Sequence, residues 1–121
     1  VRREAGLTGL AAWSRVMDYR LGDLQQRGNV DIFPDSPLGR DEVLELGVPN
    51  VFLATGARWR RDGQGRTARF GIEIADDAMV LTPDDVMDGI RPGNGPLVIY
   101  DDDHGYLGGV LATHLADLGH D

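Results

Sequence analysis

The spacing of apolar residues predicts alternating helices and strands along most of the chain. Residues 1–9 are short and glycine-punctuated and are interpreted as a linker. From 10 to 24 an apolar residue recurs every three or four positions, as on one face of an amphipathic helix: Leu10, Trp13, Met17, Leu21 and Leu24. Thr8 or Gly9 would cap this helix, and Gly28 with Asn29 would end it. Because such stripes are usually core, we interpret this one as core packing rather than as part of a cofactor site.

Continuous or alternating apolar runs predict four short strands, at residues 30–33, 51–54, 70–74 and 97–100. Helices are predicted at 40–46, at 83–88 and in the small-residue run that ends near Gly119. The second of these has the clearest local signal in the chain. Thr82 fits the N-cap, Pro83 the first helical position, acidic residues the first turn, and Gly89 the end.

Strands that alternate with helices predict an α/β fold with a mainly parallel sheet. We expect a Rossmann-like three-layer segment, an incomplete nucleotide-binding fold. Ligands of such folds lie beyond the carboxyl ends of the strands. The expected functional edges are therefore 54–57 and 101–105.

The run 97–112 has the form of the first βα unit of a dinucleotide-binding domain: an apolar strand, a tight turn and a small-residue helix. Such a turn normally needs glycine, because the backbone must approach a pyrophosphate closely. Here Asp101, Asp102 and Asp103 take the first glycine positions, and Gly105 follows. Three carboxylates repel a diphosphate, and the helix dipole, at about 1 kcal/mol or less per charge, does not reverse this. The sequence therefore predicts a degenerate dinucleotide turn.

Charge and composition exclude several classes of partner. With 12 basic and 20 acidic residues the formal net charge is −8, which argues against nucleic acid and anionic membranes. No apolar run approaches the roughly 20 residues of a membrane span, and no signal peptide is visible. Cysteine is absent, which excludes disulfides, cysteine-ligated clusters and thiol nucleophiles within these residues. These features are compatible with a cytoplasmic protein, and the chain opening at Val1 without a methionine suggests a piece of a larger one.

The basic, glycine-rich loop 58–66 and the histidines have more than one interpretation. Arg58, Trp59, Arg60 and Arg61 would contact a nucleotide phosphate, dock on the rest of a larger protein, or form a solvated loop with Trp59 folded onto the core. His104, beside the three aspartates, is interpreted as part of a solvated acidic turn rather than of a metal site, because neighbours in sequence do not readily converge on one ion. His114 is interpreted as a partly buried packing residue.

Four stretches together resemble one family. They are the helix around Trp13-Ser14 and Asp18-Tyr19-Arg20, the run 53–59 (LATGARW), the run 81–89 (LTPDDVMDG), and residues 97–121. Together they resemble the C-terminal nucleotide-fold region of the trimethylamine dehydrogenase group. That group includes dimethylamine and histamine dehydrogenases and is related to 2,4-dienoyl-CoA reductase among the old-yellow-enzyme-related flavoproteins. The resemblance spans nearly all of the 121 residues.

The resemblance implies a domain organisation. In this group an upstream barrel carries FMN, a [4Fe-4S] cluster and the substrate pocket, and two domains similar to the FAD and NADPH domains of disulfide reductases follow. Residues 1–92 would then be part of the FAD/ADP-binding-like domain, and 93–121 the first βα unit of the NAD(P)-binding-like domain. This chain would hold no catalytic residue, no cofactor of its own and no metal ligand. Only Ala54, Thr55, Gly56 and Ala57 match positions near a bound nucleotide, which would be ADP.

The resemblance also implies a function. Reductases of the wider family keep glycines where this chain has Asp101, Asp102 and Asp103, whereas the amine dehydrogenases lack the fingerprint and pass electrons to an electron-transfer flavoprotein. We therefore expect a non-catalytic nucleotide-fold segment of an FMN/iron–sulfur amine dehydrogenase or N-demethylase, whose partner is the remainder of the larger chain. Alternatively, the segment binds ADP through 54–57 and 58–61, or docks an electron carrier in an NADH:flavin oxidoreductase.

Overall fold

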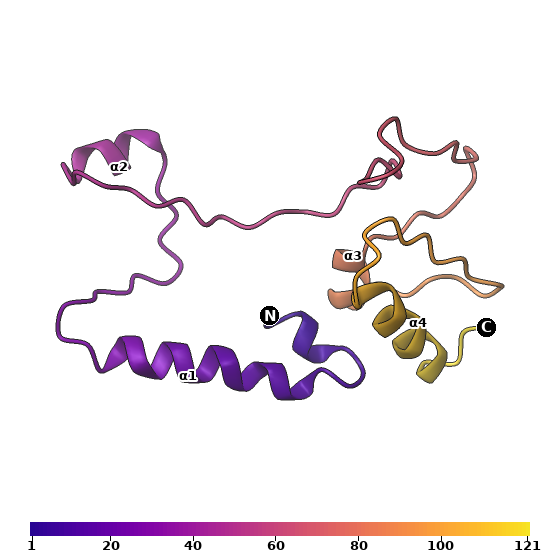
Figure 1. Cartoon of the computed structure of the whole chain (residues 1–121), viewed down its shortest axis with the longest axis horizontal. Coiled ribbons are helices and arrows are strands. Elements are labelled where there is room, and N and C mark those ends of the chain that lie inside the picture. Colours follow the sequence, from indigo (N-terminus) through magenta and orange to yellow (C-terminus); the bar gives the residue numbers. More distant parts are fainter.

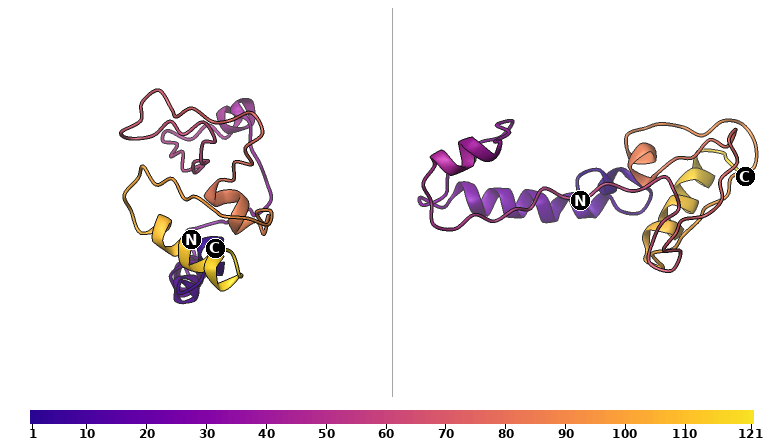
Figure 2. Two further views of the ribbon diagram at one scale, coloured as in Figure 1. Left: turned by 90° about the vertical axis from the view of Figure 1, so that its right-hand side faces the viewer. Right: turned by 90° about the horizontal axis from the view of Figure 1, so that it is seen from above.

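The computed structural model describes all residues, 1–121, as helices joined by long irregular segments. Two short 3-10 helices, η1 (Glu4–Gly6) and η2 (Ala11–Trp13), precede four α-helices. These are α1 (Ser14–Gln25), α2 (Arg40–Glu45), α3 (Pro83–Met87) and α4 (Leu107–Asp117). Figure 1 shows α1 and α2 toward one end of an elongated molecule and α3 and α4 at the other, with a long stretch of chain leading from α2 across to α3. The right-hand view in Figure 2 shows the same elongated arrangement from above, and the left-hand view looks along the long axis.

The small core joins the start of the chain to its end. Leu7, at 3% exposed the most buried residue, packs with Leu107 and Leu111 of α4. Partly buried hydrophobic residues surround this cluster: Leu10, Val86, Met87 and Val110. The interpretation of residues 1–9 as a linker is therefore wrong. A single leucine between glycines carries little periodic signal, and its burial depends on the distant helix α4.

Helix α3 forms where its local signals place it. The Thr82 side chain accepts the Asp85 N–H, and the Asp85 carboxylate accepts the Thr82 N–H, so that each residue caps the other. Pro83 occupies the first turn, where its missing N–H costs no hydrogen bond. Gly89, with φ of 84°, follows the helix. The prediction of this helix and of its N-cap is confirmed.

The predicted helix at 40–46 is confirmed as α2, and the long amphipathic helix as η2 followed by α1. The details at the ends of α1 differ from those expected. The helix begins at Ser14 without a side-chain cap and ends at Gln25, before Gly28. None of its residues is buried, and Trp13 and Leu21 are exposed. Core packing of the apolar stripe is therefore confirmed only at its start, where Leu10 packs against the core cluster and the Trp13 ring lies 5.1 Å from that of Tyr106. It is wrong for the stripe residues within α1, none of which is buried.

The predicted α/β fold is wrong, because the structure contains no β-strand and therefore no parallel, Rossmann-like three-layer sheet. A strand needs a neighbour with which its backbone pairs. Residues 51–54 have no backbone hydrogen bond, and the only one made by 97–100 joins the Leu97 N–H to the Asp121 carbonyl at 3.0 Å. The apolar runs at 30–33 and 70–74 likewise lie outside any strand. The apolar runs are present in the sequence, but no second segment of the chain pairs with them to form a sheet.

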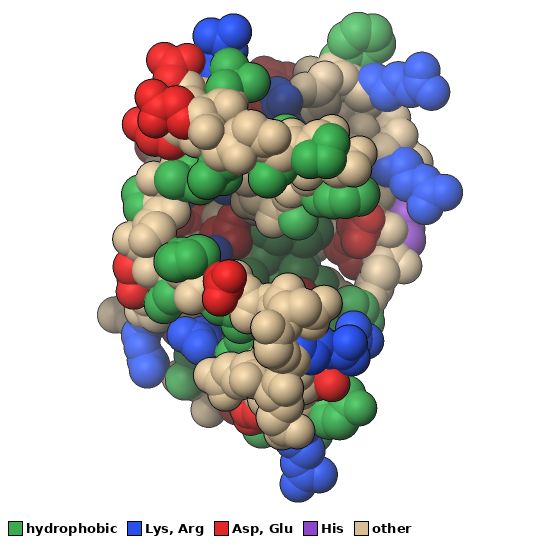
Figure 3. Space-filling view, turned by 90° about the vertical axis from the view of Figure 1, so that its left-hand side faces the viewer, with side chains coloured by type: hydrophobic (Ala, Val, Ile, Leu, Met, Phe, Trp, Pro, Cys, Tyr) green, Lys and Arg blue, Asp and Glu red, His purple; other side chains and the backbone are tan.

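The exposed surface is large for a chain of this size. A folded monomer of 13.2 kDa is expected to expose about 6,400 Å², whereas this chain exposes 10134 Å². The exposed side chains include 24 large hydrophobic ones, among them Phe52 and Leu53 at 93% and 82%. Figure 3, seen from the end of the molecule where α1 and α2 lie, shows an open hollow with hydrophobic side chains deep inside it. No helix is long and apolar enough to cross a lipid bilayer.

Candidate functional site

The acidic turn precedes α4, and its carboxylates accept backbone hydrogen bonds. Asp101 Oδ1 accepts the N–H groups of Asp103 and His104, each at 3.0 Å. This bonding tightens the turn, and His104 adopts the left-handed conformation with φ of 54°. The other oxygen of Asp101 lies so close to Gly108, in the first turn of α4, that a methyl group there would overlap it. The start of the helix is thus approached by the chain's own carboxylate.

Asp102 joins the acidic turn to the basic loop. Its Oδ2 accepts the Thr67 N–H at 2.8 Å, and the side chain is half-buried. Gly65 lies directly against this carboxylate, where a Cβ atom would collide with it. Two of the three predicted turn aspartates are therefore hydrogen-bonded within the chain rather than free in solvent. Asp103 and Gly105 lie exposed between Asp101 and α4.

The basic loop and the acidic turn both line a groove of about 840 Å³. Half of its lining residues are hydrophobic, and α4 contributes Leu111 and Leu115. Residues 58–61, 63–66 and 101–103 also line it. The structure thus brings together two of the segments that the sequence singled out, although they are more than 30 residues apart.

Ala54, Thr55, Gly56 and Ala57 do not take part in this groove. All four are exposed, no hydrogen bond joins them to another residue, and Gly56 has φ of 77°. The two predicted functional edges therefore do not meet at one site within this chain. That Ala54, Thr55, Gly56 and Ala57 lie near a bound ADP stays a prediction.

Two of the four arginine side chains in the basic loop are paired within the chain. Arg60 binds the Asp62 carboxylate, and this ion pair lowers the pKa of Asp62 to about 2. Arg61 donates to the Val80 carbonyl at 2.8 Å and to Asp85 at 2.6 Å. Arg58 and Arg66 make no ion pair and line the groove. The loop therefore has two arginines without an ion pair, Arg58 and Arg66, beside the hydrophobic lining of the groove. Whether they contact a phosphate or another part of a larger protein stays a prediction.

Asp85 is the polar centre of the buried region. Its carboxylate accepts the Thr82 N–H at 2.6 Å, the Thr82 hydroxyl at 2.7 Å and the Arg61 guanidinium at 2.6 Å. These bonds, those from the Thr82 backbone first, lower the pKa of Asp85 to about 2. Thr82 and Asp85 are both buried. The sequence predicted the cap but gave no sign that the distant Arg61 completes it.

Helix α3 also holds the start of the chain and the basic loop. Arg3 donates to Asp84 at 2.8 Å and pairs with Asp88 at 2.5 Å. Asp84 in turn accepts the Trp59 N–H at 3.1 Å. These contacts could not be predicted from the sequence, because acidic residues in a first helical turn are expected for reasons of the helix dipole alone.

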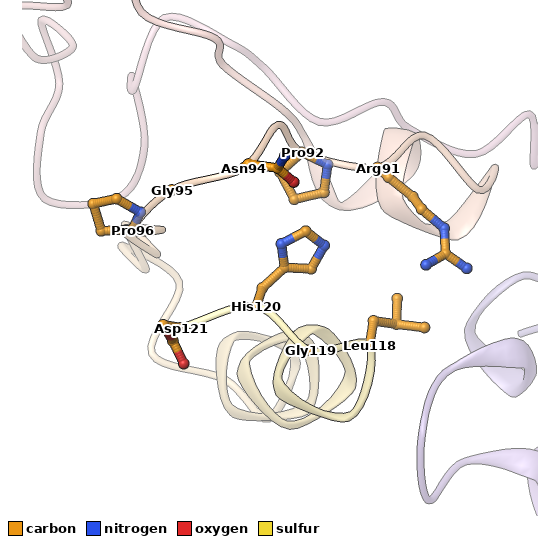
Figure 4. Close-up of a pocket in the computed structure, with 9 residues that line it drawn as sticks. All are labelled: Arg91, Pro92, Asn94, Gly95, Pro96, Leu118, Gly119, His120 and Asp121. Atoms are coloured by element: carbon orange, nitrogen blue, oxygen red, sulfur yellow. The ribbon is translucent and has the colours of Figure 1, made fainter.

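The histidines lie at separate places. His114, half-buried on α4, faces Thr8, whose N–H lies 3.3 Å from the ring Nδ1, so its interpretation as a packing residue is confirmed. Figure 4 shows the His120 ring turned toward Pro92 in a pocket of about 610 Å³ between residues 91–96 and the end of α4. No three His, Asp or Glu side chains converge in an arrangement that would hold a metal ion.

Comparisons with known proteins match the chain almost from end to end. Dimethylamine dehydrogenase from Hyphomicrobium sp. (strain x) is 32% identical over 124 residues, covering 97% of this chain and 17% of that protein. The solved structure of histamine dehydrogenase from Rhizobium sp. 4-9 is 44% identical with a TM-score of 0.89, and covers 99% of this chain and 19% of its own. No family model matches.

A second solved structure agrees with the first. It is 6-hydroxypseudooxynicotine amine oxidase from Pseudomonas geniculata N1, 44% identical with a TM-score of 0.90, covering 98% of this chain and 18% of that one. The chain thus spans less than a fifth of the length of the relatives it matches. Identity and backbone course agree over the same residues in both solved structures. The chain is therefore homologous to one segment of dimethylamine dehydrogenase, histamine dehydrogenase and this amine oxidase.

Proposed function

We propose that this chain is a non-catalytic segment of a larger amine dehydrogenase, a flavin-dependent oxidoreductase whose FMN, iron–sulfur cluster and substrate pocket lie elsewhere in its sequence. One observation carries the proposal: 99% of the chain follows the backbone of histamine dehydrogenase at 44% identity while covering 19% of that protein. The names of all three relatives describe the oxidation of an amine. The role of the segment in such an enzyme is structural.

The surface of the chain supports a structural role. Its exposed area exceeds that expected for a folded monomer by about 3,700 Å², which is more than the roughly 1,000–2,500 Å² that one partner buries in an obligate interface. Several of the polar residues that the sequence singled out are bonded within the chain: Asp101 and Asp102 accept backbone N–H groups, and Arg61 donates to Asp85. Such a segment contributes packing surface rather than reacting groups.

The acidic turn before α4 bears on whether the enzyme uses a nicotinamide coenzyme or a separate electron carrier. Asp101 lies against the first turn of α4, where a dinucleotide phosphate would need to approach the backbone. An anionic coenzyme there would be repelled by the negative charge of Asp101. It would also find the N–H groups of Asp103 and His104 already hydrogen-bonded to that carboxylate. The enzyme would therefore not take hydride from NADH or NADPH at this turn, but would pass electrons from its flavin to a separate carrier.

Anaerobic reduction of the flavin tests the function in the larger protein that contains this sequence. We expect an amine, tried as trimethylamine, dimethylamine and histamine, to bleach the flavin absorbance, and NADPH to leave it unchanged. Bleaching by NADPH and by no amine would instead assign the protein to the NADH:flavin oxidoreductases. The matched variant Asp101→Gly tests the turn itself: if the carboxylate is what excludes the coenzyme, this variant gains NADPH binding that the parent protein lacks.

A further inference from the structure

The connection that follows α3 carries Asn94 between two glycines, Gly93 and Gly95. All three residues are exposed. Gly95 has φ of 135°, and neither glycine has another atom within 4 Å of the place where a Cβ would lie. Because glycine adopts backbone conformations that other residues exclude, the chain on both sides of this asparagine is free to change its dihedral angles.

The two groups that could react here are both free of hydrogen bonds. The Gly95 N–H donates to no acceptor. The Asn94 side chain makes no hydrogen bond either, although an amide offers two N–H donors and one carbonyl acceptor. A bond between the Gly95 nitrogen and Cγ of Asn94 would close a five-membered ring, the ring size that forms most easily.

We propose that Asn94 is a site of slow, non-enzymatic deamidation, a reaction that makes exposed asparagines chemically labile. The Gly95 nitrogen attacks Cγ of Asn94 and forms a cyclic imide. The bond from Cγ to the side-chain nitrogen breaks, and this nitrogen leaves as ammonia together with the proton of the Gly95 N–H. Water then opens the imide at one of its two carbonyls. The products are aspartate and isoaspartate, in which the main chain runs through the former side chain.

Two aspartates are also followed by glycine, but the structure holds both of them. Asp88 pairs with Arg3 at 2.5 Å, and the Gly89 N–H that would attack it donates to a carbonyl of α3 at 3.0 Å. The Asp62 carboxylate is bound by Arg60. Ring closure at either aspartate first requires one of these interactions to break, whereas ring closure at the asparagine requires none.

The reaction changes both the charge and the length of the backbone. Each product adds a carboxylate to the pocket that Arg91 and His120 also line, and Figure 4 shows Asn94 across this pocket from His120. Isoaspartate also adds one methylene group to the main chain, three residues before the Leu97 N–H that donates to the Asp121 carbonyl at 3.0 Å. We therefore expect this N–H to exchange with solvent faster in the isoaspartate form.

Incubation of the larger protein that contains this sequence, at mildly alkaline pH, tests the proposal by mass spectrometry. A protease that cuts before aspartate releases residues 88–100 as one peptide from the unmodified chain. Isoaspartate resists this protease and leaves the peptide whole with a gain of one mass unit, whereas aspartate adds a cut before position 94. We expect both products to accumulate with time, relative to a sample digested identically at time zero.

The other two asparagines are internal controls. Asn29 and Asn50 are each followed by valine, and they should react at least about tenfold more slowly because a β-branched neighbour crowds the attacking nitrogen. Equal rates at the three asparagines overturn the proposal, as does a peptide 88–100 that stays unchanged. Neither readout depends on whether the protein oxidises amines, so the proposed function and this site succeed or fail separately.

A synthetic peptide of residues 84–100 separates the effect of structure from that of sequence. We expect Asn94 to deamidate in the protein within about threefold of its rate in the peptide, because no contact restrains it. Isomerisation at Asp88 should be at least about tenfold slower in the protein, because α3 holds the Gly89 N–H. If Asn94 is slowed as much as Asp88, the loop is held in place and the proposal fails.

Two matched variants test which nitrogen attacks. Gly95→Ala keeps the asparagine but crowds the attacking nitrogen, and should slow deamidation by about tenfold. Gly93→Ala places the same methyl group on the other side of Asn94 and should change the rate by less than about threefold. Equal effects of the two variants exclude the Gly95 nitrogen as the nucleophile. If Gly95→Ala does not fold, the comparison of Asn94 with Asn29 and Asn50 still decides the question.

Discussion

Removing the Thr82 hydroxyl should loosen α3 measurably. The substitution Thr82→Ala deletes two bonds: the one in which the hydroxyl oxygen accepts the Asp85 N–H at 3.3 Å, and the one in which the hydroxyl donates to the Asp85 carboxylate at 2.7 Å. Loss of a helix N-cap costs about 1 kcal/mol. The second bond involves a buried, charged acceptor and adds to this cost, although the Thr82 N–H and Arg61 still bind that carboxylate. We expect a total of about 2 kcal/mol, or about a 30-fold rise in the opening equilibrium.

Hydrogen exchange at the amides of Asp88 and Gly89 reports this opening, since both N–H groups donate to carbonyls within α3. Thr82→Ser retains the hydroxyl and is the matched control, for which we expect a change of less than about threefold. If Thr82→Ala and Thr82→Ser exchange alike, the hydroxyl is solvated rather than part of the buried network, and the assignment of Asp85 as its polar centre fails.

Three further changes probe other parts of the molecule. Leu111→Ala opens a cavity in the core beside α4 and should cost about 2–3 kcal/mol, the low end for leucine because the core is small, measured as faster exchange along α4. Because the hydrogen bonds from Thr82 lower the pKa of Asp85 from 3.8 to about 2, its contribution to stability is complete above pH 3.8 and is lost as the pH falls toward 2. Unfolding monitored against pH should show this loss in the parent protein and not in Asp85→Asn. Gly71→Ala and Gly89→Ala both place a side chain at positive φ, but only at position 71 does the new Cβ also collide with a backbone carbonyl. Thermal unfolding should therefore show the larger loss for Gly71→Ala.

The elements that could be predicted from the sequence are those whose determinants are local. Thr82, Pro83 and Gly89 specify α3 within eight residues, and the structure forms the helix with the expected cap. The periodic stripe that begins at Leu10 likewise predicted a helix, because the spacing of apolar residues depends only on helical geometry. What the stripe did not reveal is whether anything in the chain packs against it. That depends on the tertiary neighbours of α1.

The predicted strands are absent because a strand, unlike a helix, depends on a second segment of chain. Residues 51–54 and 97–100 have the apolar composition of buried strands, yet a strand is a property of two segments, and the pairing partner is not among these 121 residues. Burial of Leu7 and the bond from Arg61 to Asp85 were also missed, because each joins residues that no local pattern connects. Of the candidate site, the sequence identified the acidic turn and the basic loop, but not that Asp102 and Gly65 bring them together.

The distribution of paired charge separates the two ends of the chain. Around α3 and α4 five carboxylates are bonded within the chain: Asp84 and Asp88 to Arg3, Asp85 to Arg61, and Asp101 and Asp102 to backbone N–H groups. In residues 31–57, five carboxylates share the single Arg40, which pairs only with Asp41 beside it. This range therefore carries a net charge of −4, five acidic residues against one basic one, which is half of the −8 of the whole chain. The same range bears Phe52 and Leu53, which are 93% and 82% exposed, so unpaired carboxylates and exposed apolar side chains occur together in it.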